Sequence, residues 1–187
     1  MKKISVLGPK DTFSDYAAQK YLENHPQSEA EISYQKTIRN VFEDLKSGNS
    51  QIAVVPIENM SQGIVAVTHD ALNEFDVCIT EELILPVQFS FLSKIKHSQI
   101  KKIFVHPVAQ GQCSKFLCKY PSSEIIHTDS NMASFEKLNE FSDCGAIVPS
   151  HIFEANEKDY RFCIQNISDN QNNYTRFLVL QNSNEAS

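Results

Sequence analysis

Short apolar segments alternate with amphipathic segments along this chain, and that alternation limits the folds open to it more than any other feature. Residues 4–7 are typical of a buried strand, and residues 51–55 are typical of a second one. Between them, apolar side chains recur with helical spacing from Thr37 to Gly48. The threonine is placed to cap the start of a helix and the glycine to cap its end. A strand, a helix and a strand in this order predict a parallel sheet with helices on its faces.

Further segments of the first part of the chain carry local signals of the same kind. Thr12 is placed to cap another helix, and Asp15 follows at the spacing of a capping box. Residues 63–75 predict a helix, and residues 77–82 and 85–92 predict extended segments.

The alternation is interrupted around residues 76–92 and then resumes, which predicts two lobes. Strands are expected at 102–105, 124–127, 145–148 and 175–180, and helices at 109–120, at 131–141 and after Pro149. The predicted fold class is α/β, with two lobes, mainly parallel central sheets and a cleft between the lobes. Ligands of such folds bind beyond the carboxyl ends of the strands.

Composition excludes several classes of partner. The formal net charge of −6 argues against nucleic acids and anionic membranes, although a local anion site needs only a few donors. The start MKKISVLGPK lacks the apolar core of a secretory signal, and no apolar run has membrane-spanning length. The five cysteines form no C-x-x-C pair. They predict reduced, mostly buried thiols in a cytoplasmic protein and no metal site.

Two segments of the first lobe carry polar side chains at the ends of predicted strands. Residues 8–14 join a strand to a helix, and the free N–H groups of a helix start suit a carboxylate. A capped helix start without a ligand explains these residues equally well. Residues 55–63 end a strand in polar residues and a glycine, and taken alone they are better explained by a local turn.

Two later segments offer other functional groups. His106, in residues 106–113, is a candidate acid, base or ligand, but a lone histidine beside a proline is more often structural. Residues 173–180 place Thr175 and Arg176 at the mouth of an apolar strand. A hydroxyl can donate to a leaving group and a guanidinium can hold a carboxylate, yet an edge-strand arginine in water is the simpler interpretation of this segment alone.

Taken in order, the stretches GPKDTFSDYAA, VVPIENMSQGIV, HPVAQGQCSKFL and NYTRFLVL resemble the catalytic domain of prephenate dehydratase. The resemblance runs from residue 4 to residue 180. It implies a bilobed fold like that of the type 2 periplasmic binding proteins, which we divide into residues 1–78 with 166–187 and residues 79–165. It also implies the family reaction of phenylalanine biosynthesis. In that reaction prephenate loses carbon dioxide and its ring hydroxyl to give phenylpyruvate, without a metal or organic cofactor.

The same resemblance implies roles for individual residues. Thr175 matches the threonine of the family's T-R-F motif, which is the favoured proton donor to the leaving hydroxyl. The substrate-binding positions carried over from the motifs are Thr12, Ser14, Asn59, His106, Ser130, Arg176 and Phe177. Neighbours on a regular strand point to opposite faces. We therefore expect a bend at the strand mouth that lets both Thr175 and Arg176 reach the ligand.

The chain departs from the family pattern at Asp11, Met60, Val105, Val108, Asn131 and Arg161. Several hydrogen-bonding positions of the family site have become apolar or changed size, so two other interpretations stay open. One is a prephenate decarboxylase-like enzyme that keeps the hydroxyl, and the other is a non-catalytic dicarboxylate-binding module. The retained Thr175 favours the dehydratase.

Two further expectations follow from the resemblance. Family members associate, so a homodimer or larger assembly is expected. The chain ends where the family's C-terminal ACT regulatory domain usually begins, so feedback inhibition by phenylalanine is not expected.

Overall fold

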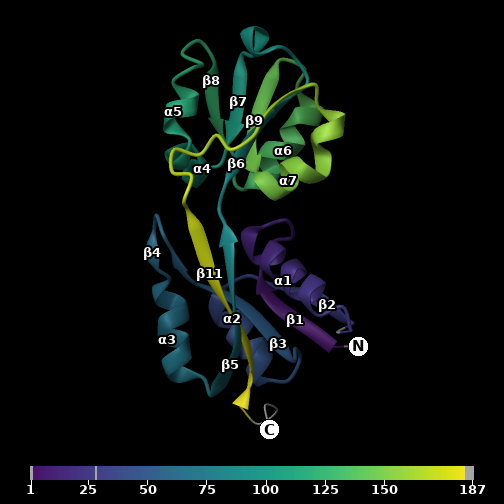
Figure 1. Ribbon diagram of the computed structural model, residues 1–187, viewed down its shortest axis with the longest axis vertical. Helices are drawn as coiled ribbons and strands as arrows, with labels where there is room; N and C mark the ends of the chain where they lie inside the picture. Colours follow the sequence, from purple (N-terminus) through teal and green to yellow (C-terminus); the bar gives the residue numbers. More distant parts are fainter. Residues whose placement is uncertain (1, 28, 184–187) are drawn as a thin grey trace. The chain divides into compact units, whose positions relative to one another are not determined.

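The computed structural model describes residues 2–27 and 29–183, which form two compact units (Figure 1). The first unit runs to Pro86 and resumes at Asn173, and the second comprises Val87–Asn172. The boundaries expected after residues 78 and 165 are therefore displaced. The first moves because residues 77–86 form one continuous strand of the first unit. The second moves because backbone groups of Ile167 and Asp169 bond to others of the second unit.

The first unit is built on a sheet in the order β2-β1-β3-β11-β5, with β4 paired to β3. Its strands are β1 (Lys2–Leu7), β2 (Ala30–Gln35), β3 (Ile52–Asn59), β4 (Gly63–Ile64), β5 (Val77–Pro86) and β11 (Tyr174–Asn182). β1 pairs in parallel with β2 and β3, whereas β11 pairs antiparallel with β3 and β5. The expectation of a mainly parallel sheet is therefore wrong for this unit. The chain leaves the unit along β5 and returns along β11, so these two strands run in opposite directions.

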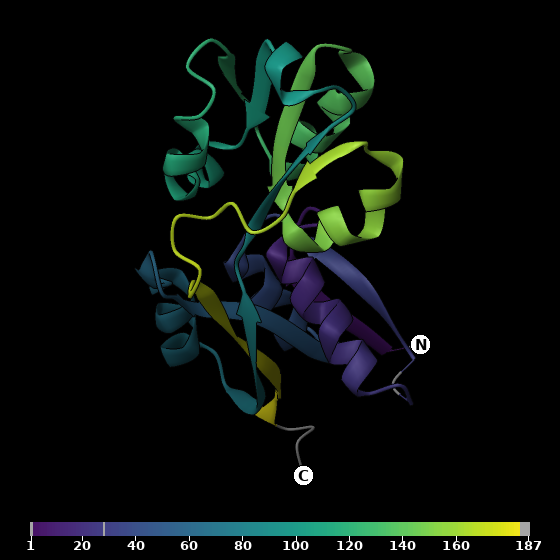
Figure 2. The ribbon, with the colours of Figure 1, turned by 45° about the horizontal axis from the view of Figure 1, so that its top comes forward.

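Helices cover both faces of this sheet. α1 (Phe13–Asn24) packs on one face, and Figure 2 shows it lying along β1. α2 (Ile38–Lys46) and α3 (Ala66–Glu74) belong to the core of the other face. Successive residues of β11 alternate between the two cores. Phe177 and Val179 belong to the α1 core, and Leu178 and Leu180 belong to the α2–α3 core.

Local helix signals in the sequence are confirmed. The Thr12 hydroxyl accepts a hydrogen bond from the Asp15 N–H at 3.3 Å, and the Thr37 hydroxyl accepts one from the Asn40 N–H at 3.1 Å. Gly48 follows α2 with a φ of +75°, a left-handed conformation that glycine adopts without a steric penalty.

Several segments differ from expectation. Residues 30–35 form an edge strand and residues 162–164 form another, and neither was expected from the sequence. Residues 63–64 form β4, so the helix expected from residue 63 begins only at Ala66. The helix expected at 109–120 is two short helices, α4 (Pro107–Gln112) and α5 (Ser114–Leu117), separated at Cys113.

The second unit has a five-stranded sheet in the order β10-β6-β9-β7-β8. Its strands are β6 (Phe89–Ser93), β7 (Lys102–Val105), β8 (Glu124–His127), β9 (Cys144–Pro149) and β10 (Phe162–Ile164). β7 pairs in parallel with β8 and β9, and the pairs β6–β9 and β6–β10 are antiparallel. Its other helical segments are α6 (Asn131–Glu140), α7 (Ser150–Asn156) and two 3₁₀ turns, His97–Gln99 and Glu157–Asp159. This sheet is also mixed rather than mainly parallel.

The packing of the second unit depends on a glycine in β9. The ring of Phe91, which is fully buried, lies directly over Gly145. A Cβ atom at residue 145 would lie 2.1 Å from the Cζ atom of Phe91. Only glycine therefore lets this ring take its place against the sheet.

Candidate active site

Polar side chains gather at one edge of the first sheet. β1 and β3 are parallel, and β11 is antiparallel to β3. The carboxyl ends of β1 and β3 and the start of β11 therefore lie toward the same end of the sheet. Asn59 is the last residue of β3 and lies opposite Thr175 of β11. The loop after β1 ends at Thr12, which caps α1, and Ser14 lies in the first turn of that helix.

The central contact at this edge joins Asn59 to Thr175. The Asn59 Nδ2 group donates a hydrogen bond to the Thr175 Oγ1 atom at 2.8 Å and another to the Tyr174 carbonyl at 3.3 Å. The Asn59 Oδ1 atom accepts from the backbone N–H groups of Ser61 at 2.9 Å and Gln62 at 3.1 Å. Thr175 is 7% exposed and Asn59 is 9% exposed.

This arrangement decides what the threonine hydroxyl can do. Two backbone N–H groups bind the Asn59 oxygen, so the amide cannot turn over, and its N–H groups must face Thr175 and Tyr174. The Thr175 oxygen therefore accepts a hydrogen bond, and among the described residues its own O–H proton has no acceptor. The Asn59 amide is fully engaged by protein groups, which does not support the expected substrate contact.

The loop after β1 is held by a buried carboxylate. Asp15, which is fully buried, accepts hydrogen bonds from the Asp11 N–H at 2.8 Å, the Tyr34 hydroxyl at 2.8 Å and the Gln19 side chain at 2.9 Å. Burial and the hydrogen bond to Asp15 raise the pKa of Tyr34. The capping box expected here is thus incomplete, because the carboxylate bonds the N–H of Asp11 instead of that of Thr12.

The two hydroxyls expected to bind ligand at this helix start, those of Thr12 and Ser14, are partly engaged or buried. The Thr12 hydroxyl accepts from Asp15 and donates to the Leu7 carbonyl at 3.4 Å, and Ser14 is buried. Asp11 has a φ of +64°, a left-handed conformation that is uncommon for residues other than glycine. The sequence indicated Asp15 only as a capping-box partner of Thr12, and nothing in it indicated Tyr34 as a partner of the carboxylate.

Arg176 points away from Thr175. Its Nε and Nη2 atoms bond both oxygens of Glu82 at 2.9 and 3.0 Å, and its Nη1 atom bonds Glu58 at 3.0 Å. The Glu82 hydrogen bonds raise the pKa of Arg176, and Arg176 in turn lowers the pKa of Glu82. The pairing of β11 with β5 is regular from Tyr174 to Val179. The irregularity at the strand mouth lies in the pairing of β3 with β11, which shifts between Arg176 and Phe177. The Arg176 guanidinium nevertheless bonds Glu82 and Glu58 on the face opposite Thr175, so its expected role in holding substrate is not supported.

Phe177 also differs from its expected role. It is 1% exposed and belongs to the α1 core of the first unit. Because Phe177 lies two residues along β11 from Thr175, it shares the face of Thr175 but sits deeper in the sheet. It is a packing residue and does not line the candidate site.

The two predicted site residues of the second unit lie at one edge of its own sheet. β7, β8 and β9 are parallel, and His106 follows the end of β7. Ser130 follows β8 and caps α6, where its hydroxyl accepts a hydrogen bond from the Ala133 N–H at 3.0 Å. His106 occupies the position before α4, with no side-chain capping bond.

The cysteines are free thiols, and two of them are buried. Burial raises the pKa of Cys113 to about 12 and that of Cys144 to about 11. Both thiols are therefore protonated at neutral pH and are poor nucleophiles. Cys118 is exposed, and Cys78 and Cys163 are partly buried, so the expectation of mostly buried thiols is wrong. Among the described residues, no group of three or more histidine, cysteine, aspartate or glutamate side chains is arranged to hold a metal ion. Nor does any helix in that part of the chain have the length and apolar character needed to cross a membrane.

Comparison with known proteins places these features in a family context. A family model described as prephenate dehydratase matches residues 4–185. The bifunctional chorismate mutase/prephenate dehydratase of Enterobacter agglomerans is 31% identical over 95% of this chain and 46% of its own length. The prephenate dehydratase of Lactococcus lactis subsp. cremoris is 32% identical over 95% of this chain and 63% of its own length. The chain thus spans about half the length of the bifunctional relatives it matches.

Solved structures agree with these matches. The prephenate dehydratase of Staphylococcus aureus has a TM-score of 0.80 and 28% identity, over 98% of this chain and 67% of that one. The prephenate dehydratase of Arthrobacter aurescens, solved in complex with L-Phe, has a TM-score of 0.78 and 26% identity, over 96% of this chain and 59% of that one.

Proposed function

This chain belongs to the prephenate dehydratase family, and from that premise we propose that it converts prephenate to phenylpyruvate in phenylalanine biosynthesis. The reaction is a carbon–oxygen lysis coupled to decarboxylation. Formation of the aromatic ring drives it, so the proposal includes no metal or organic cofactor. We further propose that the protein is cytoplasmic and works as a homodimer or larger assembly.

The observation that carries the proposal is the hydrogen bond from Asn59 to Thr175. It leaves the threonine proton free to be donated and puts an N–H dipole on the oxygen that loses it. A threonine hydroxyl is a weak acid, so it can protonate a leaving group only if charge developing on its oxygen is stabilised in place. A buried amide fixed by two backbone N–H groups supplies such stabilisation without having to reorganise.

In the proposed step the bond between the ring and its carboxylate breaks, and its electron pair enters the ring as carbon dioxide leaves. The carbon–oxygen bond on the opposite side of the ring breaks with its electron pair on oxygen. The Thr175 hydroxyl gives its proton to that oxygen, which leaves as water, and a solvent proton restores the hydroxyl. The organic product is phenylpyruvate.

The test is turnover of prephenate at neutral pH by wild-type protein and two Thr175 variants, followed as phenylpyruvate formed. Thr175→Val keeps the side-chain volume but removes the proton, so kcat should fall by about 100-fold or more while KM changes little. Thr175→Ser keeps the hydroxyl and should retain more activity. Thr68→Val is a matched control, because the Thr68 hydroxyl is also buried and donates to the Pro56 carbonyl at 2.7 Å from α3. That control should lose stability without losing kcat.

Other outcomes would select other functions. Thr175→Val turning over at the wild-type rate would show that the assigned proton donor is wrong. Carbon dioxide released without phenylpyruvate would indicate a decarboxylase that keeps the hydroxyl. Prephenate bound by the wild type but left unchanged would indicate a binding module.

A further inference from the structure

The guanidinium N–H groups of Arg176 donate hydrogen bonds to two carboxylates. Glu82 takes the Nε and Nη2 atoms in a bidentate pair, and Glu58 takes Nη1. A substrate carboxylate would have to displace one of these partners. The three side chains are each about two-fifths exposed, at 40% for Arg176, 42% for Glu58 and 39% for Glu82.

The network lies where the pairing of β3 with β11 is irregular. Arg176 pairs with Glu58 but Phe177 pairs with Pro56, so Ile57 is an extra residue in β3. Such a bulge disrupts the backbone ladder locally. Between the bulge and the end of β3, contacts between side chains of β3 and β11 therefore contribute more to keeping the two strands in register.

Two such pairs stand beyond the bulge, on opposite faces of the same two strands. On one face Asn59 bonds Thr175, and on the other Arg176 bonds Glu58 and reaches across to Glu82 of β5. Exposed ion pairs add little stability. Their effect here is on geometry, because the guanidinium links the end of β3 and the start of β11 to the middle of β5, and β11 carries the Thr175 hydroxyl.

We infer that Arg176 is a positioning residue, which acts through Thr175 and Asn59 and does not itself bind the substrate. The kinetic part of this inference rests on the proposed function. The structural part, that Arg176 holds the Asn59–Thr175 contact in place, does not.

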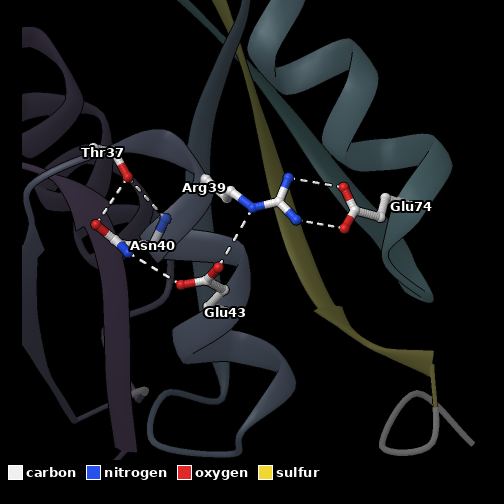
Figure 3. A network of polar contacts seen from close by, with 5 residues as sticks. All are labelled: Thr37, Arg39, Asn40, Glu43 and Glu74. Carbon is white, nitrogen blue, oxygen red and sulfur yellow. Dashed lines mark hydrogen bonds and ion pairs between the residues drawn. The ribbon is translucent and has the colours of Figure 1, made fainter.

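The first unit contains a second arginine network that serves as a control. Arg39 of α2 makes a bidentate pair with Glu74 of α3 and lies 3.4 Å from Glu43 (Figure 3). The Arg39 and Glu74 side chains are each 53% exposed. Like Arg176, Arg39 is an arginine that binds two carboxylates. Its network joins α2 to α3, and it includes no residue of the strands that carry Asn59 and Thr175.

The kinetic experiment compares Arg176→Gln and Glu82→Gln with Arg39→Gln and Glu74→Gln. If Arg176 positions Thr175, both variants of its network should lower kcat by about 10- to 100-fold with KM nearly unchanged, because small displacements of a reacting group are costly. The double variant should lose no more than Arg176→Gln alone, since both changes break one network. The two control variants should keep the wild-type kcat and KM.

A different pattern would overturn the inference. A substrate-binding arginine predicts that Arg176→Gln raises KM with kcat unchanged. It also predicts that Glu82→Gln lowers KM, because it frees the guanidinium. Wild-type kcat and KM in both Arg176-network variants would equally reject a positioning role.

A second measurement is independent of turnover. The side-chain NH₂ resonances of Asn59 in ¹⁵N-labelled protein report its bonds to Thr175 and Tyr174. Arg176→Gln should shift these resonances and speed their hydrogen exchange, whereas Arg39→Gln should leave them unchanged. If the wild type does not convert prephenate, the proposed function fails and this arm still decides the positioning role. Unchanged Asn59 resonances in Arg176→Gln would reject that role.

Discussion

At the scale of single residues, Asn59 connects the Thr175 hydroxyl to the backbone of the turn after β3. Both sides of its amide are in use, with two backbone donors on its oxygen and two acceptors on its nitrogen. A buried amide with every group satisfied has one orientation and cannot easily adapt to another. The direction of the Thr175 proton is therefore fixed by the turn that follows β3.

A carboxylate at residue 59 should reverse the hydrogen bond, so that the Thr175 hydroxyl donates where it now accepts. Asn59→Asp could still accept from the backbone N–H groups of Ser61 and Gln62, but it has no N–H to offer Thr175. The threonine would instead donate its proton to the aspartate and could no longer give it to a leaving group. We expect kcat to fall by about 100-fold or more, the scale seen when one preorganised donor is removed.

The measurement for Asn59→Asp is prephenate turnover together with thermal unfolding. Asn73→Asp is a suitable control, since the Asn73 amide donates to the His69 carbonyl within α3 at 3.0 Å and is assigned to no site. A fully active Asn59→Asp protein would contradict the role assigned to the amide.

Thr175, Asn59 and Thr12 were singled out by the resemblance to the family motifs, since each segment taken alone is explained by a turn, a strand end or a helix cap. The motifs could not give the partners of Arg176. Which face a strand residue occupies depends on register, and the bulge at Ile57 changes the register of β3. Glu82 is far from Arg176 in the chain, so only the pairing of β5 with β11 brings them together.

At the scale of elements, the correct predictions are those that depend on neighbouring residues. Threonine caps and helical spacing act within a few residues, and α1, α2 and α6 begin where the sequence indicated. β2 and β4 were missed because each is short or exposed and gains its stability from pairing with a distant strand. The mixed character of both sheets likewise arises from long-range pairing that local patterns do not contain.

The contact between Phe91 and Gly145 gives a prediction at this scale. Gly145→Ala would bring a methyl group into the ring of Phe91 and should destabilise the protein by about 1–3 kcal/mol, as overpacking of a tight core does. Gly111→Ala is the matched control. That glycine lies in α4, with no atom within 4 Å of its added Cβ, so the change should be neutral or stabilising by up to about 1 kcal/mol.

Urea unfolding of the two glycine variants and the wild type provides the measurement, with circular dichroism to confirm that the native fold is kept. Equal midpoints for Gly145→Ala and the wild type would mean that Phe91 moves aside without cost. The tight contact would then have no role in stability.

At the scale of the whole molecule, exposed apolar side chains of the first unit support self-association. Ile64, Ile79 and Ile84 are 68%, 53% and 59% exposed, unusually so for isoleucine. We expect light scattering at micromolar concentration to give a mass at least twice that of one chain. Ile84→Lys should weaken this assembly, and Val108→Lys in the second unit serves as the control. A wild-type sample that contains only monomer would end this proposal.

The position of β11 has a consequence for the order in which a ribosome completes this protein. β11 lies between β3 and β5, and the whole second unit separates it from them in the chain. The second unit is one continuous stretch, so all of its strands are synthesised before β11 exists. The first unit has a gap in its sheet until residues 174–182 emerge. During synthesis the second unit can thus fold before the first, while the sheet of the first unit stays incomplete between β3 and β5.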